Sequence, residues 1–78
     1  MESCYEVNLY DKNNDVYTFI CETKDEIFAE KICKNLGKLI KEDNILRTAS
    51  DGNREPYDWC EVYDSINKRV VFTAGGIE

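Results

Sequence analysis

The sequence contains no histidine, and this absence excludes several kinds of catalytic site. Without histidine, no Ser-His or Cys-His pair can activate a nucleophile. P-loop, G-x-G-x-x-G and H-E-x-x-H motifs are also missing. The adjacent Gly75 and Gly76 precede no expected helix that would hold a phosphate. We therefore expect a protein that is not an enzyme and that needs no cofactor.

The cysteine pattern gives little support for a metal site. The sequence has four cysteines but no C-x-x-C pair, and zinc sites usually contain such close pairs. The first residues lack the features of a signal peptide, and no apolar run approaches the roughly 20 residues of a membrane span. We expect a cytoplasmic protein with no bound metal and no membrane partner. Its cysteines should be free and partly buried, with a secreted disulfide scaffold as the alternative.

Basic residues are few compared with acidic ones. The chain has 10 lysines and arginines against 16 aspartates and glutamates, which gives a net charge of −6. Phosphate backbones repel such a protein, so direct binding of nucleic acid is not expected. A basic protein surface is a better partner, although a charge of this size is also ordinary for a small soluble domain.

Alternating apolar and polar residues predict two β-hairpins. Residues 4–10 and 16–22 form the first, around a polar turn at residues 11–15. Pairing Tyr10 with Val16 would place six apolar residues on one face: Tyr5, Val7, Leu9, Tyr17, Phe19 and Cys21. Residues 59–64 and 69–74 form the second hairpin. Pairing Asp64 with Lys68 there would make Val62 face Val70 and Cys60 face Phe72.

Apolar residues at helical spacing predict a helix over residues 24–42. Thr23 and Glu26 have the spacing of a capping box at its start. Gly37 lies inside the helix, where it would allow close packing against a sheet. Residues 47–56 follow as a polar loop with an Asp51-Gly52 turn signal. The expected buried stripe follows the i, i+3, i+4 pattern and comprises Phe28, Ala29, Ile32, Cys33, Leu36, Leu39 and Ile40.

These elements predict a single α+β domain over residues 1–78. No linker, low-complexity tract or internal repeat divides the chain. The order is ββαββ, which indicates a four-stranded antiparallel sheet with one helix packed on one face. A helix of this length covers only one side of four strands, so the other side of the sheet should be bare. We expect that side to carry Glu6, Asn8, Thr18, Ile20, Glu22, Trp59, Glu61, Tyr63, Val71 and Thr73.

Aromatic residues with an acidic rim on a bare sheet face are typical of a protein-binding surface. Carboxylates spread over a sheet can also imitate nucleic-acid phosphates and occupy a basic groove on a partner. We therefore expect a non-enzymatic protein-binding module that uses this face and residues 47–59. The candidate partner-binding residues are Glu6, Glu22, Asp58, Trp59, Glu61, Tyr63 and Asp64.

In its size, acidity and ββαββ order the chain resembles phage-encoded inhibitors of host defence, such as anti-CRISPR proteins. The resemblance implies a protein partner whose basic, nucleic-acid-binding site is blocked, with Asp58, Trp59 and Glu61 as the contact residues. Two alternatives remain open. One is a homo-oligomeric structural or accessory protein whose exposed aromatic residues form a self-interface. The other is a binder of nucleotides or other small molecules, with stacking by tyrosine and tryptophan and a counter-charge from Arg47, Arg54 or Lys68.

Overall fold

The computed structural model describes residues 4–12, 14–42, 46–48, 52 and 54–76. It confirms the expected α+β class. The main sheet has four antiparallel strands in the order β2-β1-β5-β6. The elements are β1 (Tyr5–Asp11), β2 (Val16–Thr23), α1 (Glu26–Lys41), β3 (Leu46–Thr48), β4 (Arg54–Pro56), β5 (Trp59–Asp64) and β6 (Arg69–Ala74).

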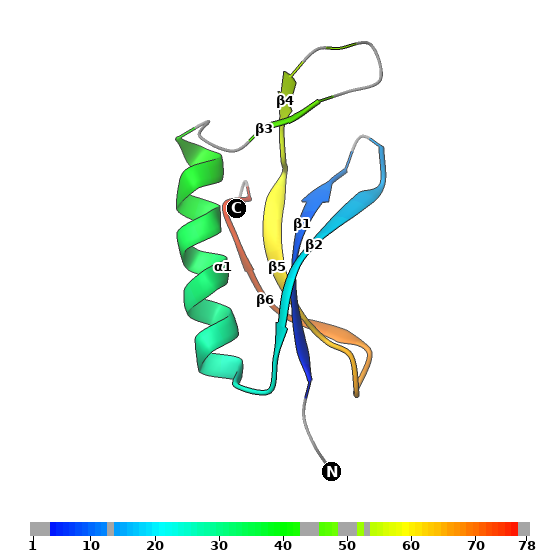
Figure 1. Cartoon of the computed structure of the whole chain (residues 1–78), viewed down its shortest axis with the longest axis vertical. Helices are drawn as coiled ribbons and strands as arrows, with labels where there is room; N and C mark the ends of the chain where they lie inside the picture. The colour runs from blue at the N-terminus through cyan, green and yellow to red at the C-terminus, as the bar shows by residue number, and fades with distance from the viewer. Residues whose placement is uncertain (1–3, 13, 43–45, 49–51, 53, 77–78) are drawn as a thin grey trace.

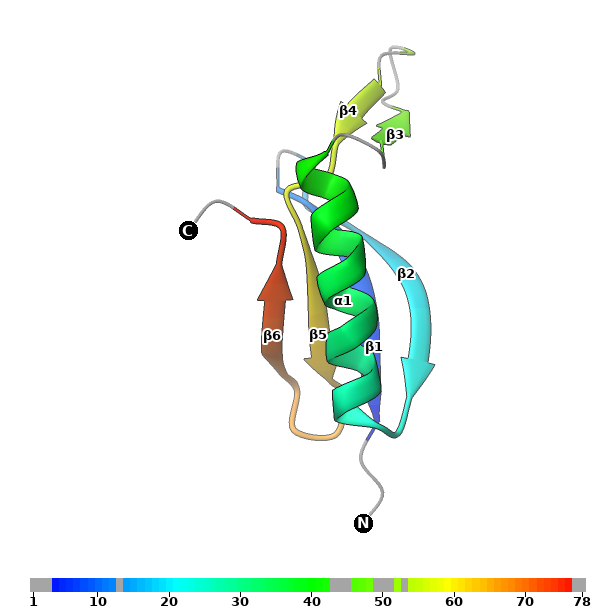
Figure 2. The same ribbon diagram turned by 90° about the vertical axis from the view of Figure 1, so that its left-hand side faces the viewer.

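Helix α1 packs along one face of the main sheet and leaves the other face uncovered (Figures 1 and 2). Apolar side chains of β1 and β5 meet the helix in a thin core. All four cysteines are free thiols, as expected, and a hydrogen bond with Cys33 together with burial raises the pKa of the Cys60 thiol. The buried Cys60 thiol therefore stays neutral and packs as a small apolar group. The core comprises Val7, Leu9, Ala29, Cys33, Ile40, Cys60 and Val62.

The start of the helix differs from the predicted capping box. Asp25 is the N-cap, and its side chain accepts a hydrogen bond from the Phe28 backbone N–H at 3.2 Å. Thr23 lies outside the helix, where its hydroxyl accepts from the Asp25 N–H. The predicted stripe is also too wide, because Phe28 and Leu39 are exposed whereas Ala29, Cys33, Gly37 and Ile40 are buried.

Gly37 brings the helix into direct contact with the end of β6. A Cβ atom at this position would lie 2.6 Å from the Cβ of Ala74 and 2.8 Å from the backbone nitrogen of Gly75. Gly75 has a φ of 88°, a conformation that other residues rarely adopt. The close approach that the sequence predicted for Gly37 is therefore confirmed, at the cost of a weak helix former inside α1.

The register of the first hairpin was predicted wrongly. Asp11, not Tyr10, pairs with Val16, so the turn is shorter than expected and Tyr17 faces Tyr10. A shift of one residue moves every affected side chain to the other face of the sheet. A β-bulge between the pairs Asn8–Phe19 and Val7–Cys21 then restores Cys21 to the helix side. Tyr17 and Phe19 consequently lie on the uncovered face rather than in the core.

The second hairpin shows the same kind of difference. Asp64 pairs with Arg69 instead of Lys68, and Tyr63 pairs with Val70. A second bulge follows, so that Val62 faces Phe72 on the helix side of the sheet. Val70 therefore lies on the uncovered face, and Val71 packs against the core. The sequence predicted the reverse arrangement, with Val70 on the helix side and Val71 on the bare side.

Both turns have the same local construction. Asp11 accepts a hydrogen bond from the Asn14 side chain at 2.7 Å, and Asp64 accepts one from the Asn67 side chain at 2.8 Å. In each turn the residue after the asparagine, Asp15 or Lys68, has a positive φ. The two segments share the pattern Tyr-Asp-x-x-Asn, a short internal similarity that the expectation of no repeat overlooked.

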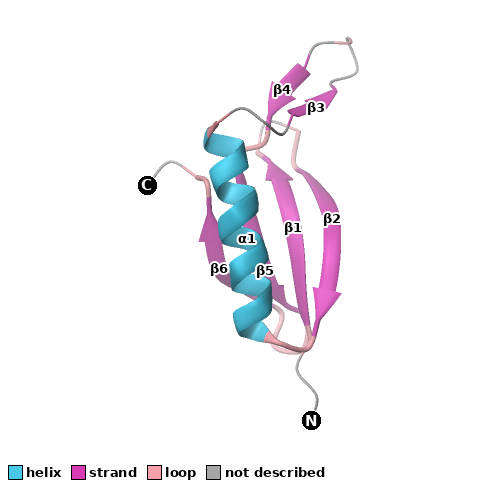
Figure 3. Cartoon of the chain, turned by 60° about the vertical axis from the view of Figure 1, so that its left-hand side comes forward, coloured by secondary structure: helices cyan, strands magenta, loops and turns pink. Residues whose placement is uncertain are grey.

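Residues 47–56 were expected to form an irregular loop, but β3 and β4 pair there as an antiparallel ribbon. The ribbon extends beyond the end of the main sheet and leads into β5 (Figures 1 and 3). Gly52, from the predicted turn, has a φ of 88°, whereas Asp51 lies outside the described residues. Among the described helices none is long and apolar enough to span a membrane.

Candidate functional site on the open sheet face

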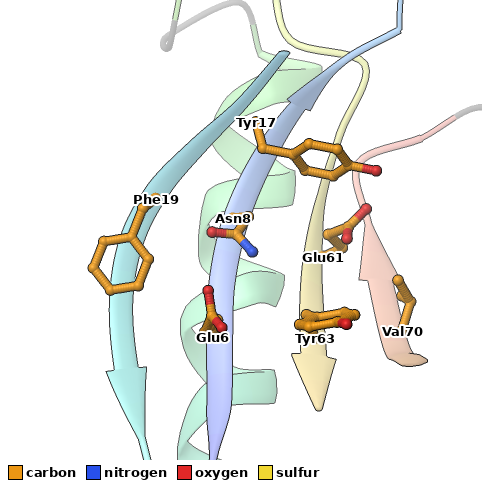
Figure 4. Close-up of a pocket in the computed structure, with 7 residues that line it drawn as sticks. All are labelled: Glu6, Asn8, Tyr17, Phe19, Glu61, Tyr63 and Val70. Carbon is orange, nitrogen blue, oxygen red and sulfur yellow. The ribbon is translucent and has the colours of Figure 1, made fainter. Parts of the chain in front are cut away.

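The sheet face that points away from α1, here called the open face, has the composition of a binding surface. Its residues follow from the strand register, because cross-strand partners share a side of the sheet. Figure 4 shows seven of them, with the helix behind the sheet. The open face comprises Glu6, Asn8, Tyr10, Tyr17, Phe19, Glu22, Trp59, Glu61, Tyr63, Val70 and Thr73.

A row of three aromatic rings crosses this face. The ring of Tyr10 on β1 lies 4.5 Å from that of Tyr17 on β2 and 4.7 Å from that of Trp59 on β5, measured between centroids. The Tyr10 hydroxyl donates to Asp15 at 2.9 Å, and this hydrogen bond raises the pKa of Tyr10 to about 12. The row therefore holds three strands together and keeps its central phenol neutral at physiological pH.

Next to this row, the open face is hollowed into a pocket of about 490 Å³. This volume lies within the roughly 300–1,000 Å³ of typical ligand sites. Among the described residues, no lysine or arginine lines the pocket. Its lining combines aromatic, aliphatic and acidic side chains from all four strands: Glu6, Asn8, Tyr17, Phe19, Glu61, Tyr63 and Val70 (Figure 4).

Two buried polar side chains form part of the floor of the pocket. Asn8 is 8% exposed, and within the described part of the chain its side-chain amide has no hydrogen-bond partner. Glu61 is 4% exposed, and its Oε1 accepts from the Trp59 indole N–H at 3.0 Å. No described cation forms an ion pair with the Glu61 carboxylate. Buried polar groups are normally satisfied, so this floor retains unused capacity for a ligand.

Tyr17 and Phe19 form the exposed side of the pocket. The ring of Tyr17 reaches across β1 toward Glu61, whereas that of Phe19 lies over β2 (Figure 4). Partial burial raises the pKa of Tyr17, and the negative charges of Glu61 and Asp15 raise it further. Phe19 is 58% exposed, although it is one of the largest apolar side chains on this face.

Four of the predicted site residues are brought together by the fold. Glu6, Glu61 and Tyr63 line the pocket, and Trp59 is hydrogen-bonded to Glu61. Glu22 pairs with Glu6 across β1 and β2, so its exposed carboxylate adds to the acidic edge of the same face.

The other two predicted residues are used by turns. The Asp58 carboxylate accepts from the Lys12 backbone N–H at 2.6 Å, next to the first turn. Asp64 is 3% exposed and accepts from the backbone N–H groups of Ile66 and Asn67 as well as from the Asn67 side chain. These contacts stabilise loops, and they leave the Asp64 carboxylate inaccessible to a partner.

Sequence reasoning missed Tyr17, Phe19 and Val70, because the misread registers assigned them to the core. Thr18 was expected on the bare side, but it pairs with Leu9 and its hydroxyl shares a hydrogen bond with that of Tyr57. The shared Tyr-Asp-x-x-Asn pattern is the sequence signal that locates both turns. In each hairpin the aspartate of this pattern is the last residue of the first strand, β1 or β5.

No protein-family model, curated protein or solved structure matches this chain. Within the described part of the chain, no group of three or more cysteine, aspartate or glutamate side chains is arranged to hold a metal ion.

Proposed function

We propose that this protein is a non-enzymatic module that binds a basic protein surface through its open face. The observation that carries the proposal is the combination, in one pocket, of exposed aromatic rings with the buried Asn8 amide and the buried Glu61 carboxylate, which has no cationic partner among the described residues. Aromatic side chains supply most of the energy of protein interfaces, and carboxylates select a positively charged partner.

Two alternative functions receive less support from the charges on this face. In a homodimer that buried the open face against itself, the carboxylates of Glu6, Glu22 and Glu61 would meet those of a second copy, and like charges repel. A nucleotide would bring phosphates to a pocket in which no described lysine or arginine is available to neutralise them. A basic protein surface would neutralise the carboxylates and would also cover the exposed aromatic rings.

The role that fits this chemistry is inhibition of a nucleic-acid-binding protein by occupation of its basic site. The net charge of −6 would speed encounter with such a site, and the aromatic residues would hold the complex together after contact. The β3–β4 ribbon is a separate two-stranded sheet beyond the end of the main sheet, and it is the second candidate contact.

An affinity pull-down tests the proposal with two matched variants. Phe19→Ala removes an aromatic ring that is 58% exposed on the open face, and Phe28→Ala removes one that is 52% exposed on the helix. We expect wild type and Phe28→Ala to capture the same basic protein at low salt, and Phe19→Ala to lose it. Capture by all three proteins alike, or a salt-resistant dimer of the bait as the sole product, would contradict the proposal.

A further inference from the structure

The pocket on the open face has the features of a site for one cationic side chain. Three aromatic rings, those of Tyr17, Phe19 and Tyr63, surround a floor with two carboxylates and an amide (Figure 4). Faces of aromatic rings attract cations, and carboxylates attract them more strongly when water is partly excluded.

We infer that this pocket receives the guanidinium group of an arginine side chain from the partner protein. This inference rests on the proposed function, because it names the group by which a basic partner would be recognised. Its physical basis is the unused hydrogen-bonding capacity of Asn8 and Glu61, which are both more than nine-tenths buried.

Arginine matches the acceptors on the pocket floor. A guanidinium presents five N–H donors in one plane. The Asn8 carbonyl oxygen, the second oxygen of Glu61 and the Glu6 carboxylate have no hydrogen bond within the described structure. An arginine would satisfy these acceptors and neutralise part of their charge at the same time.

The aromatic walls favour arginine over lysine. A guanidinium is flat and weakly hydrated, so it stacks on tyrosine and phenylalanine rings while its edge makes hydrogen bonds. A lysine ammonium is compact and strongly hydrated, and it would offer fewer donors to acceptors that are spread over β1 and β5. Phe19 on β2 and Val70 on β6 lie at opposite edges of the pocket, and either could contact the methylene groups of the arginine stem.

A titration with small probes tests this inference without the partner. The probes are N-acetyl-arginine methylamide, its neutral citrulline counterpart and its lysine counterpart. Binding is followed by the NMR shifts of the aromatic rings and of the Asn8 side-chain amide. We expect saturable shifts of Tyr17, Phe19, Tyr63 and Asn8 with the arginine probe, in the millimolar range that suits so small a ligand. Citrulline and lysine should bind about ten-fold more weakly or worse.

Variants connect the shifts to the pocket. Glu61→Gln keeps an acceptor for Trp59 but removes the charge, and we expect it to weaken the arginine probe about ten-fold. Glu6→Gln is a second pocket variant, at a residue that is half-buried. Glu30→Gln removes the same charge from the helix and should leave binding within about two-fold of wild type.

Three results would overturn the arginine pocket. They are equal binding of the arginine and citrulline probes, equal binding of the arginine and lysine probes, and NMR shifts with the arginine probe that are as large for aromatic rings outside the pocket as for those inside it. The two proposals fail separately. Loss of probe binding with continued Phe19-dependent capture of a basic protein would overturn only the arginine pocket. Specific arginine binding with no Phe19-dependent capture would overturn the proposed function as stated.

Discussion

At the scale of single residues, the carboxylates of this protein serve two different purposes. Asp64 and Asp58 accept hydrogen bonds from backbone N–H groups and thereby shape turns. Glu61 and Glu6 face the pocket, and within the described residues neither has a cationic partner. The first group contributes to the stability of the fold, whereas the second costs stability and is available for binding.

Glu61 gives a prediction about this cost. A carboxylate that is 4% exposed and has no ion-pair partner among the described residues is poorly solvated. We expect Glu61→Gln to stabilise the protein by about 1 kcal/mol, which raises Tm by roughly 4–8 °C in a domain of this size. Thermal unfolding followed by circular dichroism measures the change. A Tm below that of wild type would mean that the charge supports the fold.

Replacing Asp64 should destabilise the protein, by an amount that depends on pH. Hydrogen bonds from the side chain and backbone of Asn67, together with the charge of Arg69, hold the pKa of Asp64 below its ordinary value of 3.8. A lowered pKa means that this stabilisation is complete above about pH 4 and is lost as the pH falls through the folded value. We expect Asp64→Asn to lower Tm at pH 7 and to differ less from wild type at pH 2.

The control for this comparison is Glu30→Gln, on the helix, for which we expect no such pH-dependent gap. If the Tm difference between wild type and Asp64→Asn were as large at pH 2 as at pH 7, the ionised carboxylate would not be the stabilising group in the turn.

At the scale of elements, the helix and both hairpins could be predicted because their signals are periodic. The stripe of Ala29, Cys33 and Ile40 repeats at helical spacing, and the strands alternate as half-buried strands do. The register could not be predicted in the same way. It depends on where each turn begins, and an error of one residue at Asp11 or Asp64 inverts the faces until a bulge corrects them.

The prediction of the candidate site depended on the same strand register. Glu6, Glu61 and Tyr63 were predicted on the bare side because β1 and β5 alternate without interruption up to their turns. Tyr17 and Phe19 were missed because they follow the first turn, where the register error enters. The pocket exists because large apolar residues point away from the core, and hydrophobic patterning alone assigns such residues to the core.

Gly37 gives the prediction that belongs to the helix. A methyl group at this position would lie 2.6 Å from the Ala74 Cβ, so Gly37→Ala must push α1 away from β6. We expect a loss of about 1–3 kcal/mol in chemical denaturation, despite the better helix propensity of alanine. Asn35→Ala, at an exposed position two residues earlier, should be neutral or slightly stabilising. Equal stability of the two variants would rule out tight packing at Gly37.

At the scale of the whole molecule, the two faces of the main sheet differ in composition. One face of the main sheet is covered by α1 (Figure 2), whereas the other face carries exposed rings and carboxylates that have no cationic partner among the described residues (Figure 4). The domain is small, so exposing large apolar side chains on one face reduces an already limited core. An exposed apolar patch of this kind supports the proposal that the open face is an interaction site.

The most direct measurement of the central claim is the Kd of the purified partner for wild type, Phe19→Ala and Phe28→Ala, at low and at high salt. We predict that Phe19→Ala weakens binding about ten-fold or more, that Phe28→Ala stays within about two-fold, and that salt weakens all three complexes. Equal effects of the two substitutions, or a Kd that does not change with salt, would contradict binding of a basic partner through the open face.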